Sequence, residues 1–454
     1  MTKKIRFLIA LWTGKAARVA MRLLGRNATY LPGVIALRIC PTFLQQIGKP
    51  ARITVVTGTN GKTTVVNLLS TSLKNHGQRI LDNQLGSNTA SGVACALLAG
   101  ATITGRARHD AAILETDERS SAFILPHIKP DLLILTNLFR DSIMRNAHPE
   151  YIAGIIGSNI PPETKLVLNA DDLISCGVAP SNPRVYVGLE RMETDVVECA
   201  NLINDFQVCP GCRSELAFEY RRYHHIGRAR CPNCDFASPD YDYSGSPDPG
   251  RNKITVTDKG GETSLSLPND SVFNIYNMLT TYAALRELGL SPAEGKAALE
   301  GSAIPESRYN ETEIGGVRVI MQMAKDRNAL ACSRAFEYVV SKPGRKQLLL
   351  MMNNLSDSKA WSENTCWLYD CDFELLERDD ITRIVATGAR ALDYCLRLQF
   401  AGVPEEKLRS TEREIDAPHE LAPEPGDSVY IFYGTDAIAL AYKVRDKVLE
   451  GLRA

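Results

Sequence analysis

The sequence predicts an α/β protein of two or three domains, built on mostly parallel sheets. Its 454 residues are about three times a typical domain length of roughly 150 residues. Several strand-like runs end in glycine-rich or acidic loops and are separated by helical stretches, which is typical of a parallel sheet with ligands at the strand carboxyl ends. After residue 311 the alternation of strands and helices begins again, so a second α/β domain is expected.

The composition is that of a soluble globular protein. Hydrophobic residues make up 44% and charged residues 23% of the chain, which argues against a disordered, collagen-like or coiled-coil protein. Lysine and arginine together number 52, against 53 aspartate and glutamate residues. The chain therefore lacks the excess positive charge of a general nucleic-acid binder, and no nucleic-acid partner is expected.

The first expected element is a helix over residues 3–24, where apolar and basic residues are mixed. The uninterrupted apolar run, residues 7–12, is too short to cross a bilayer, and Lys15 and Arg18 follow it. A secretory signal is disfavoured because basic residues continue through the segment without a small-residue cleavage site, so a cytoplasmic protein is expected. The favoured interpretation is a helix docked on the protein's own core. The alternative is attachment of its basic face to the inner face of the plasma membrane.

A nucleotide-binding loop follows the first expected strand. The β-branched run at residues 53–56 leads into Thr57-Gly58-Thr59-Asn60-Gly61-Lys62-Thr63-Thr64 and then into an apolar helical stretch. In such a loop glycines turn backbone N–H groups toward phosphate oxygens, Lys62 reaches the outer phosphates and Thr63 ligates magnesium. Val56 stands where the general phosphate-loop pattern has its first glycine, so this loop is a variant. A chance Gly-Lys-Thr is disfavoured because strand, loop and helix agree.

The variant loop resembles that of the Mur ligase family, ATP-dependent enzymes that activate a carboxylate as an acyl phosphate and then attack it with an amine. Other segments follow in the family's order. Those similar to family motifs are Leu114-Glu115-Thr116-Asp117-Glu118, Thr136-Asn137, Asn169-Ala170-Asp171-Asp172 and Phe273-Asn274-Ile275-Tyr276-Asn277. The last resembles the segment that meets adenine, with Phe273 where the family has histidine.

The resemblance implies ATP and Mg²⁺ as cofactors and assigns roles to single residues. Glu115 and Thr63 would hold magnesium, and Lys62, Glu115 and Arg308 would assist phosphoryl transfer. The nucleotide-binding set would be Thr59, Asn60, Gly61, Lys62, Thr63, Thr64, Asn274 and Asn277. For the acidic residues 115–118 the alternative is a solvated acidic turn.

Two cysteine pairs predict a structural Zn²⁺ site. Cys209, Cys212, Cys231 and Cys234 have the spacing Cys-x2-Cys-x18-Cys-x2-Cys, which can place four thiolates tetrahedrally around one zinc ion. Four sulfur ligands leave no open coordination position, so the ion would stabilise the fold and would not catalyse. A disulfide framework is disfavoured because it requires an oxidising compartment.

The segment between the cysteine pairs is basic and is expected to form a solvated strand pair, with nucleic-acid binding as the disfavoured alternative. Its basic residues are Arg221, Arg222, His224, His225, Arg228 and Arg230.

A four-cysteine ribbon inserted in a Mur ligase-like domain resembles the MurT family, whose members are the synthetase subunits of the enzyme that amidates the D-glutamate of lipid II. The resemblance covers nearly the whole chain. It implies an N-terminal helical segment (1–46), a Mur ligase-like central ATP-binding domain (47–310) with a zinc ribbon insertion (205–240), and a C-terminal Rossmann-like α/β domain (311–454). Strands of the last domain are expected at residues 317–321, 347–352, 383–387 and 428–433.

The resemblance also implies a partner. In the MurT family the last domain docks a class I glutaminase, GatD, and lends it a catalytic aspartate from a loop that corresponds to residues 353–361 here. Asp357 is the candidate and Asp370 is a competitor, since the loop lacks the family's glycine. The nearby segment with Asp326 and Arg327 departs from the family's Ala-Lys-Asn-Pro loop. No cysteine of the chain lies in a recognisable glutaminase motif, so ammonia would come from the partner.

Together these features indicate an ATP-dependent carbon–nitrogen ligase that amidates the D-glutamate α-carboxylate of lipid II to D-isoglutamine in peptidoglycan biosynthesis. One alternative is an amino-acid-adding Mur ligase, which needs no glutaminase. Another is a nucleotide-binding scaffold whose zinc ribbon recruits a partner without catalysis. The sequence leaves open whether the acceptor is lipid-linked or soluble.

Overall fold

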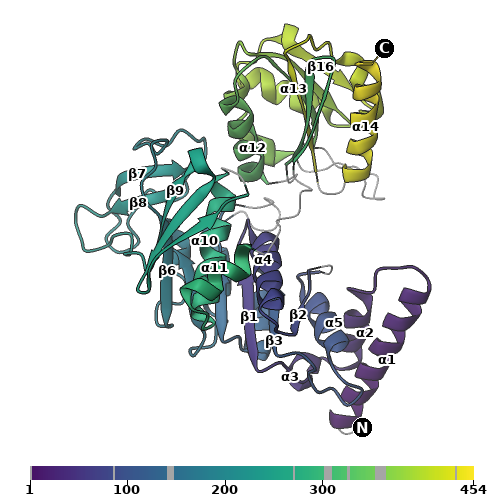
Figure 1. Cartoon of the computed structure of the whole chain (residues 1–454), viewed down its shortest axis with the longest axis vertical. Coiled ribbons are helices and arrows are strands. Elements are labelled where there is room, and N and C mark those ends of the chain that lie inside the picture. The colour runs from purple at the N-terminus through teal and green to yellow at the C-terminus, as the bar shows by residue number, and fades with distance from the viewer. Residues whose placement is uncertain are drawn as a thin grey trace. The chain divides into compact units, whose positions relative to one another are not determined.

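The computed structural model of the chain describes residues 3–84, 87–140, 148–268, 271–300, 309–324, 328–352, 365–434 and 437–453. Two compact units are present, the first holding most of residues 1–304 and the second most of residues 305–454 (Figure 1). Each unit has its own sheet and its own hydrophobic core. Among the described helices, none is long and apolar enough to span a bilayer.

The first unit opens with three helices: α1 (Lys3–Leu23), α2 (Leu31–Ile39) and α3 (Phe43–Gln46). One face of α1 is buried, and its Phe7 and Leu11 belong to the same core cluster as Val55 of the sheet. Gly14 allows close packing, because a Cβ there would lie 2.3 Å from Leu98 Cδ1. The predicted helix docked on the protein's own core is therefore confirmed.

A nine-stranded sheet in the order β11-β10-β9-β6-β5-β4-β1-β3-β2 organises the first unit. The seven strands from β9 to β2 pair in parallel, and β10 and β11 add an antiparallel edge. The strands are β1 (Arg52–Thr57), β2 (Ile80–Asp82), β3 (Ala111–Glu115), β4 (Leu132–Leu135), β5 (Lys165–Asn169), β6 (Arg184–Leu189), β9 (Tyr243–Asp248), β10 (Lys253–Asp258) and β11 (Gly261–Ser266). Because β5, β4, β1 and β3 are parallel neighbours, the loops after their carboxyl ends meet at one edge of the sheet.

Helices connect these strands and cover the sheet. They are α4 (Lys62–Asn75), α5 (Ala90–Gly100), α6 (Ser121–Ile128), α8 (Pro149–Gly157), α9 (Leu173–Cys176), α10 (Val272–Glu287) and α11 (Pro292–Glu300), with a short 3-10 helix at Pro249–Arg251. Helix α10 packs on α4 and against β6, and α11 also packs on α4. Figure 1 shows these three helices together on one face of the sheet.

Residues 190–242 lie between β6 and β9 and contain the four cysteines. Within them, β7 (Ala217–Tyr223) and β8 (Ile226–Arg230) pair as an antiparallel hairpin. A small apolar cluster joins Cys209 and Cys231 to Phe218 of the hairpin and to Leu173 of α9. This segment is called the ribbon below.

The second unit contains a six-stranded sheet in the order β12-β13-β17-β14-β15-β16, parallel except for β12. Alternate residues of β14 point to opposite faces: Leu348 and Leu350 pack toward α12 and α13, and Leu349 and Met351 toward α14. The strands are β12 (Tyr309–Ile314), β13 (Val317–Met323), β14 (Lys346–Met351), β15 (Ile381–Thr387), β16 (Leu408–Thr411) and β17 (Ser428–Tyr433). The helices are α12 (Ala329–Ser341), α13 (Ala391–Phe400) and α14 (Ile438–Gly451), with 3-10 helices at Cys366–Tyr369, Phe373–Leu376, Glu405–Lys407 and Glu414–Glu420. The predicted C-terminal α/β fold is confirmed.

Candidate functional site

The candidate nucleotide loop lies at the carboxyl end of β1, where residues 58–61 lead into α4. Gly58 and Gly61 have φ angles of 123° and 87°, which residues with a side chain rarely adopt. Space also requires glycine, because a Cβ at Gly58 would lie 2.3 Å from Thr136 Oγ1, and one at Gly61 would lie 2.3 Å from Asn277 Oδ1. The two glycines thus let the loop pass close to the ends of β4 and α10 while presenting the amino end of α4, where anions bind.

The residues after β4 hold the loop in shape. Asn60 N–H donates to Asn137 Oδ1 at 3.0 Å, and Thr136 Oγ1 donates to the Asn60 carbonyl at 2.7 Å. Thr59 N–H donates to the Asn137 carbonyl at 2.8 Å, and its hydroxyl accepts from Phe139 N–H at 2.9 Å. The Thr-Asn pair after β4 thus forms a network that fixes Thr59 and Asn60.

Lys62 begins α4 and is only 9% exposed. Its ammonium group forms an ion pair with Glu118, Nζ to Oε1 at 2.7 Å, and also donates to the carbonyls of Gly58 and Thr59. Glu118 is 2% exposed. The buried cation of the loop, Lys62, is therefore paired with the buried carboxylate of Glu118, which lies three residues after the end of β3.

The acidic run after β3 is not the solvated turn considered as an alternative, because Asp117 and Glu118 are both buried. Asp117 Oδ1 accepts the backbone N–H groups of Arg119 and Ser120, each at 3.2 Å, and so shapes the turn into α6. The alternative is wrong because the run folds back against the nucleotide loop, which a sequence pattern alone does not show.

Thr63 and Glu115, the predicted magnesium ligands, are in contact: Thr63 Oγ1 donates to Glu115 Oε2 at 2.9 Å. The other carboxylate oxygen accepts from Asn88 Nδ2 at 3.1 Å, and Asn83 bonds the backbone N–H and C=O of Glu115 at 2.8 and 2.9 Å. A hydroxyl and a carboxylate are hard oxygen ligands that suit Mg²⁺, which takes its remaining ligands from phosphates and water. The donor set fits the ion. Asn83 and Asn88 belong to no motif that the sequence offered.

Helix α10 brings the two predicted asparagines to the loop. Asn274 and Asn277 are buried, and the amide oxygen of Asn277 lies beside Gly61. Phe273, which stands where the family has histidine, has its ring 5.4 Å from that of Tyr223 in the ribbon hairpin. The amino end of α10 therefore meets both the nucleotide loop and the ribbon.

The basic residues of the ribbon contradict the prediction of a solvated strand pair. Arg222, His224 and His225 are buried, whereas Arg230 is exposed. Arg222 forms ion pairs with Asp171 at 3.1 Å and Asp195 at 2.8 Å. The prediction failed because the carboxylates that neutralise Arg222 come from distant positions in the chain.

Asp171 is the centre of this buried network, called the ribbon anchor below and comprising Arg222, Asp171, Asp195, Tyr241 and Tyr276. The hydroxyls of Tyr241 and Tyr276 donate to the two oxygens of Asp171 at 2.7 and 2.6 Å. Burial and then Asp171 raise the pKa of Tyr241. Burial by itself would lower the pKa of Arg222, but Tyr276, Asp171 and Asp195 outweigh it and raise that pKa. The arginine therefore stays charged and the tyrosines stay neutral.

The neighbouring Asp172 has a second structural role. Its side chain caps α9 by accepting the N–H groups of Ile174 and Ser175, and it accepts Leu138 N–H at 2.7 Å. His225 Nε2 lies 3.2 Å from its Oδ1. The Asp-Asp turn after β5 therefore fixes the ribbon to the sheet.

The four ribbon cysteines come together as predicted. Their sulfur atoms all lie within 4.8 Å of one another, with Cys209 and Cys234 at 3.5 Å and Cys212 and Cys231 at 3.3 Å. All twelve cysteines lie in the described residues, and none of them forms a disulfide. A tetrahedral zinc ion with bonds of about 2.3 Å places its sulfur ligands about 3.8 Å apart, so the cluster fits zinc with a small outward relaxation.

Known families match both units. The Mur ligase middle domain model matches residues 56–191, and the MurT ligase C-terminal model matches residues 326–436. The lipid II isoglutaminyl synthase (glutamine-hydrolyzing) subunit MurT of Staphylococcus aureus is 30% identical over 397 residues, 87% of this chain and 88% of the relative. The protein of the same name from Streptococcus pneumoniae is 30% identical over 409 residues, 89% of each chain. The chain belongs to the MurT family.

Solved structures show how widely the MurT fold is shared. The pseudomurein peptide ligase type C from Methanothermus fervidus superposes with a TM-score of 0.65 at 17% identity, covering 90% of this chain and 81% of that one. MurF from Acinetobacter baumannii gives 0.64 at 15% identity, covering 92% and 80%. At such low identity the likeness establishes the Mur ligase-like fold, as predicted.

Several MurT-type predictions fall outside the described residues, namely Arg308, Asp326, Arg327 and Asp357. The competitor Asp370 is described. It follows the 3-10 helix Cys366–Tyr369, and Arg140 Nη1, in the same unit, lies 3.9 Å from its Oδ2. No observation chooses between Asp370 and Asp357, and both stay predictions.

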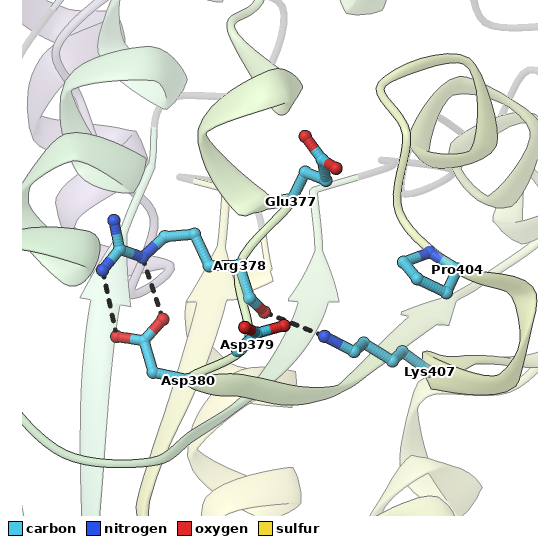
Figure 2. Close-up of a pocket in the computed structure, with 6 residues that line it drawn as sticks. All are labelled: Glu377, Arg378, Asp379, Asp380, Pro404 and Lys407. Atoms are coloured by element: carbon cyan, nitrogen blue, oxygen red, sulfur yellow. Dashed lines mark hydrogen bonds and ion pairs between the residues drawn. The ribbon is translucent and has the colours of Figure 1, made fainter.

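The second unit also has a surface hollow of about 550 Å³ (Figure 2), lined by Glu377, Arg378, Asp379, Asp380, Pro404 and Lys407. Arg378 Nε donates to Asp380 Oδ1 at 2.8 Å, and Lys407 Nζ donates to the Arg378 carbonyl at 2.9 Å. The hollow lies at the amino ends of β15 and β16, whereas parallel sheets bind ligands at the carboxyl ends of their strands. Arg378 is already paired with Asp380, and no catalytic role is assigned to the hollow.

Proposed function

We propose that this chain is the synthetase subunit of a lipid II isoglutaminyl synthase. In the proposed reaction, ATP phosphorylates the α-carboxylate of D-glutamate in the lipid II stem peptide, which gives an acyl phosphate and ADP. Ammonia then attacks the carbonyl carbon, phosphate leaves, and the product after loss of a proton is D-isoglutamine. The proposal is supported by MurT-family membership, since each of the two relatives carries this activity in its name and is matched over most of its length.

The observation that carries the ligase chemistry is the pair of contacts at the start of α4, Lys62 to Glu118 and Thr63 to Glu115. We propose that Lys62 exchanges its contact with Glu118 and the loop carbonyls for phosphate oxygens when ATP binds. Because Lys62 is nearly buried, water screens its charge only weakly. Electrostatic stabilisation by such a charge is the main way in which enzymes accelerate phosphoryl transfer.

Thr63 and Glu115 are the proposed magnesium ligands, with Asn83 and Asn88 holding the carboxylate in place. Magnesium bound there would neutralise charge on the phosphate oxygens. For the other predicted site residues we propose that Asn274 and Asn277 bind the adenine end of ATP and that Arg308 assists at the phosphoryl group.

Ammonia is proposed to come from a GatD-type class I glutaminase that docks on the C-terminal domain, residues 311–454, to form a heterodimer. Both relatives are named as subunits of a glutamine-hydrolysing enzyme. Asp357 is proposed to orient the glutaminase histidine as the third member of a triad, with Asp370 as its competitor. The complex would act on the cytoplasmic side of the membrane, where nucleotides are available.

Reconstitution tests the proposal. The full chain is mixed with a GatD-type glutaminase, ATP, Mg²⁺, glutamine and lipid II, and the acceptor is analysed by mass spectrometry. We expect a carboxyl group converted to a carboxamide, ADP formed in equal amount, and ammonium salts replacing glutamine when the glutaminase is omitted. A water-soluble nucleotide-linked precursor, tested in parallel, separates a lipid-linked acceptor from a soluble one.

Each rival function gives a different result in the same assay. An amino-acid-adding Mur ligase would extend the acceptor with an amino acid and ignore the glutaminase. A non-catalytic scaffold would show no ATP turnover that depends on the acceptor. Unamidated lipid II with all components present would contradict the proposal.

A further inference from the structure

Helix α1 has two apolar faces, of which one is buried in the core of the first unit and the other is exposed. The buried side, with Phe7 and Leu11, packs into the core of the first unit. The other side carries a row of exposed apolar side chains, from 38% to 83% exposed: Ile5, Ile9, Trp12, Val19 and Leu23. With the exposed Ala16 between Trp12 and Val19, successive members are four or three residues apart, so they form one stripe along the helix.

The stripe continues onto a neighbouring turn. Trp12 Nε1 donates to the Ile103 carbonyl at 2.8 Å, and the Ile103 side chain is itself exposed. The indole N–H is therefore satisfied by the protein while the ring remains accessible. Tryptophan is enriched at membrane–water interfaces, where its amphipathic ring lies at the level of the headgroups. The five α1 side chains and Ile103 are called the α1 patch.

The N-terminal segment that carries α1 has only positive charges. Residues 1–50 contain nine lysine and arginine residues and no aspartate or glutamate, although the whole chain is nearly neutral. Lys15 is used internally, since it donates to the carbonyls of Leu98 and Ala101. Lys4 and Arg22 are exposed and by their helical positions border the stripe on one side, and Arg6 borders it on the other.

We propose that the α1 patch docks on an anionic membrane surface. Helix α1 lies parallel to the surface, with the apolar stripe at the boundary of headgroups and acyl chains and the basic residues over anionic headgroups. Charge selects this occupant over a second copy of the chain, because a symmetric pairing of two α1 helices would bring two sets of positive residues together and α1 carries no carboxylate. The buried face of α1 keeps the helix folded before it meets the lipid.

Sedimentation with vesicles tests this docking. The full chain is mixed with vesicles of phosphatidylcholine alone or with added phosphatidylglycerol, without nucleotide or partner protein. We expect binding to the phosphatidylglycerol vesicles that weakens as salt rises. The triple variant Ile9→Ser, Val19→Ser, Leu23→Ser should bind at least tenfold more weakly, and so should the charge variant Lys4→Glu, Arg22→Glu.

The matched control is the triple variant Leu392→Ser, Leu396→Ser, Phe400→Ser, which removes an equally exposed apolar row from α13 in the second unit and should bind like the wild type. Unchanged circular dichroism of the α1 variants shows that they fold. Absence of binding by the wild type, or equal binding by wild type and α1 variants, overturns the proposal. A wild-type dimer in solution that the apolar α1 variant dissociates also overturns it, in favour of a second copy. Amidation plays no part in the assay, so failure of the proposed function would leave this result standing.

Discussion

The first unit contains two groups of buried charges that differ in what surrounds them. At the nucleotide loop, Lys62 faces Glu118 and two loop carbonyls, and the carboxylate of Glu115 contacts the hydroxyl of Thr63. In the ribbon anchor, Asp171 receives two tyrosine hydroxyls, a backbone N–H and the Arg222 guanidinium, which also binds Asp195.

The difference matches the proposed function, in which Lys62 exchanges its partners when ATP binds, whereas the charges of the ribbon anchor keep theirs. Lys62 and Thr63 sit on the first turn of a helix, next to a glycine-rich loop that a phosphate can enter. The anchor residues include a strand end, a hairpin and a helix, and replacing one of them leaves its buried partners short of a hydrogen bond or an ion pair. Burial alone therefore does not mark a functional charge, and variants at the two groups should fail in different ways.

The largest expected effect is on turnover. Lys62→Ala should lower acceptor-dependent ATP hydrolysis by about 10²–10³ or more, because it would remove the cation that is proposed to face the transferring phosphoryl group. Phosphate release in the reconstituted complex measures this. Lys74→Ala on the same helix, where the exposed lysine pairs with the half-buried Asp82, is the control and should keep wild-type activity. Turnover of the Lys62 variant within tenfold of wild type would remove Lys62 from the mechanism.

The next effect is on stability. Arg222→Met should lower the free energy of unfolding by about 3–5 kcal/mol, because Asp171 and Asp195 would be left buried without their cation. Urea denaturation measures it. Arg79→Met is the control, since its pair with Asp110 is exposed on both sides, and its denaturation midpoint should stay close to wild type. If both variants shifted equally, the ribbon anchor would not be the stabilising network described above.

The sequence predicted more of the nucleotide loop than of the ribbon anchor, and the reason is distance along the chain. Gly58 to Thr64 form a contiguous strand–loop–helix whose chemistry follows from local spacing. Arg222 lies on the same face of β7 as Phe218 and Tyr220, and an arginine within an apolar alternation was the signal for a buried ion pair. Its partner Asp171, however, is 51 residues away, and no pattern in one sequence joins them.

The same argument explains the asparagines at the proposed magnesium site. Asn83 and Asn88 reach Glu115 because β2 and β3 are parallel neighbours, although Asn83 and Glu115 are 32 positions apart in the chain. The sequence predicted that strand ends would meet but not which polar side chains would orient which carboxylate. Arg308 and Asp357, which belong to the resemblance, remain predictions.

Metal removal should affect the cysteine end of the ribbon and leave the ribbon anchor intact. A chelator, or Cys231→Ser, should release one zinc per chain and lower the melting temperature by about 2–4 °C, equivalent to about 1 kcal/mol. The effect is smaller than for Arg222→Met because the ribbon anchor still holds β7. Zinc analysis and hydrogen exchange measure it, with faster exchange expected around Cys209 and Cys234 but not around Arg222. Uniform loss of protection across the ribbon would contradict this separation.

The smallest effect concerns the exposed pair that served as a control. Hydrogen bonds from Arg79 lower the pKa of Asp110 to about 2, against about 3.9 in an unfolded chain. Its contribution to stability is therefore present above about pH 4 and is lost as the pH falls from about 4 through 2. Asp110→Asn should be slightly less stable than wild type at pH 7, and the gap in urea midpoints should close toward pH 2. If the difference in urea midpoints widened in acid, the pair with Arg79 would not be the cause of the lowered pKa of Asp110.

The place of the ribbon in the chain has one further consequence. Strands β6 and β9 are parallel neighbours, and residues 190–242 are the connection between them. A parallel pair requires a crossover of a dozen or more residues, for which most α/β proteins use a helix. In this protein the cysteine-bearing ribbon takes the place of that crossover helix. Replacing residues 190–242 with a tight turn would prevent β9 from pairing in parallel with β6, and β10 and β11 would be lost from the sheet with it. The ribbon is therefore needed for the sheet of the first unit to have these three additional strands.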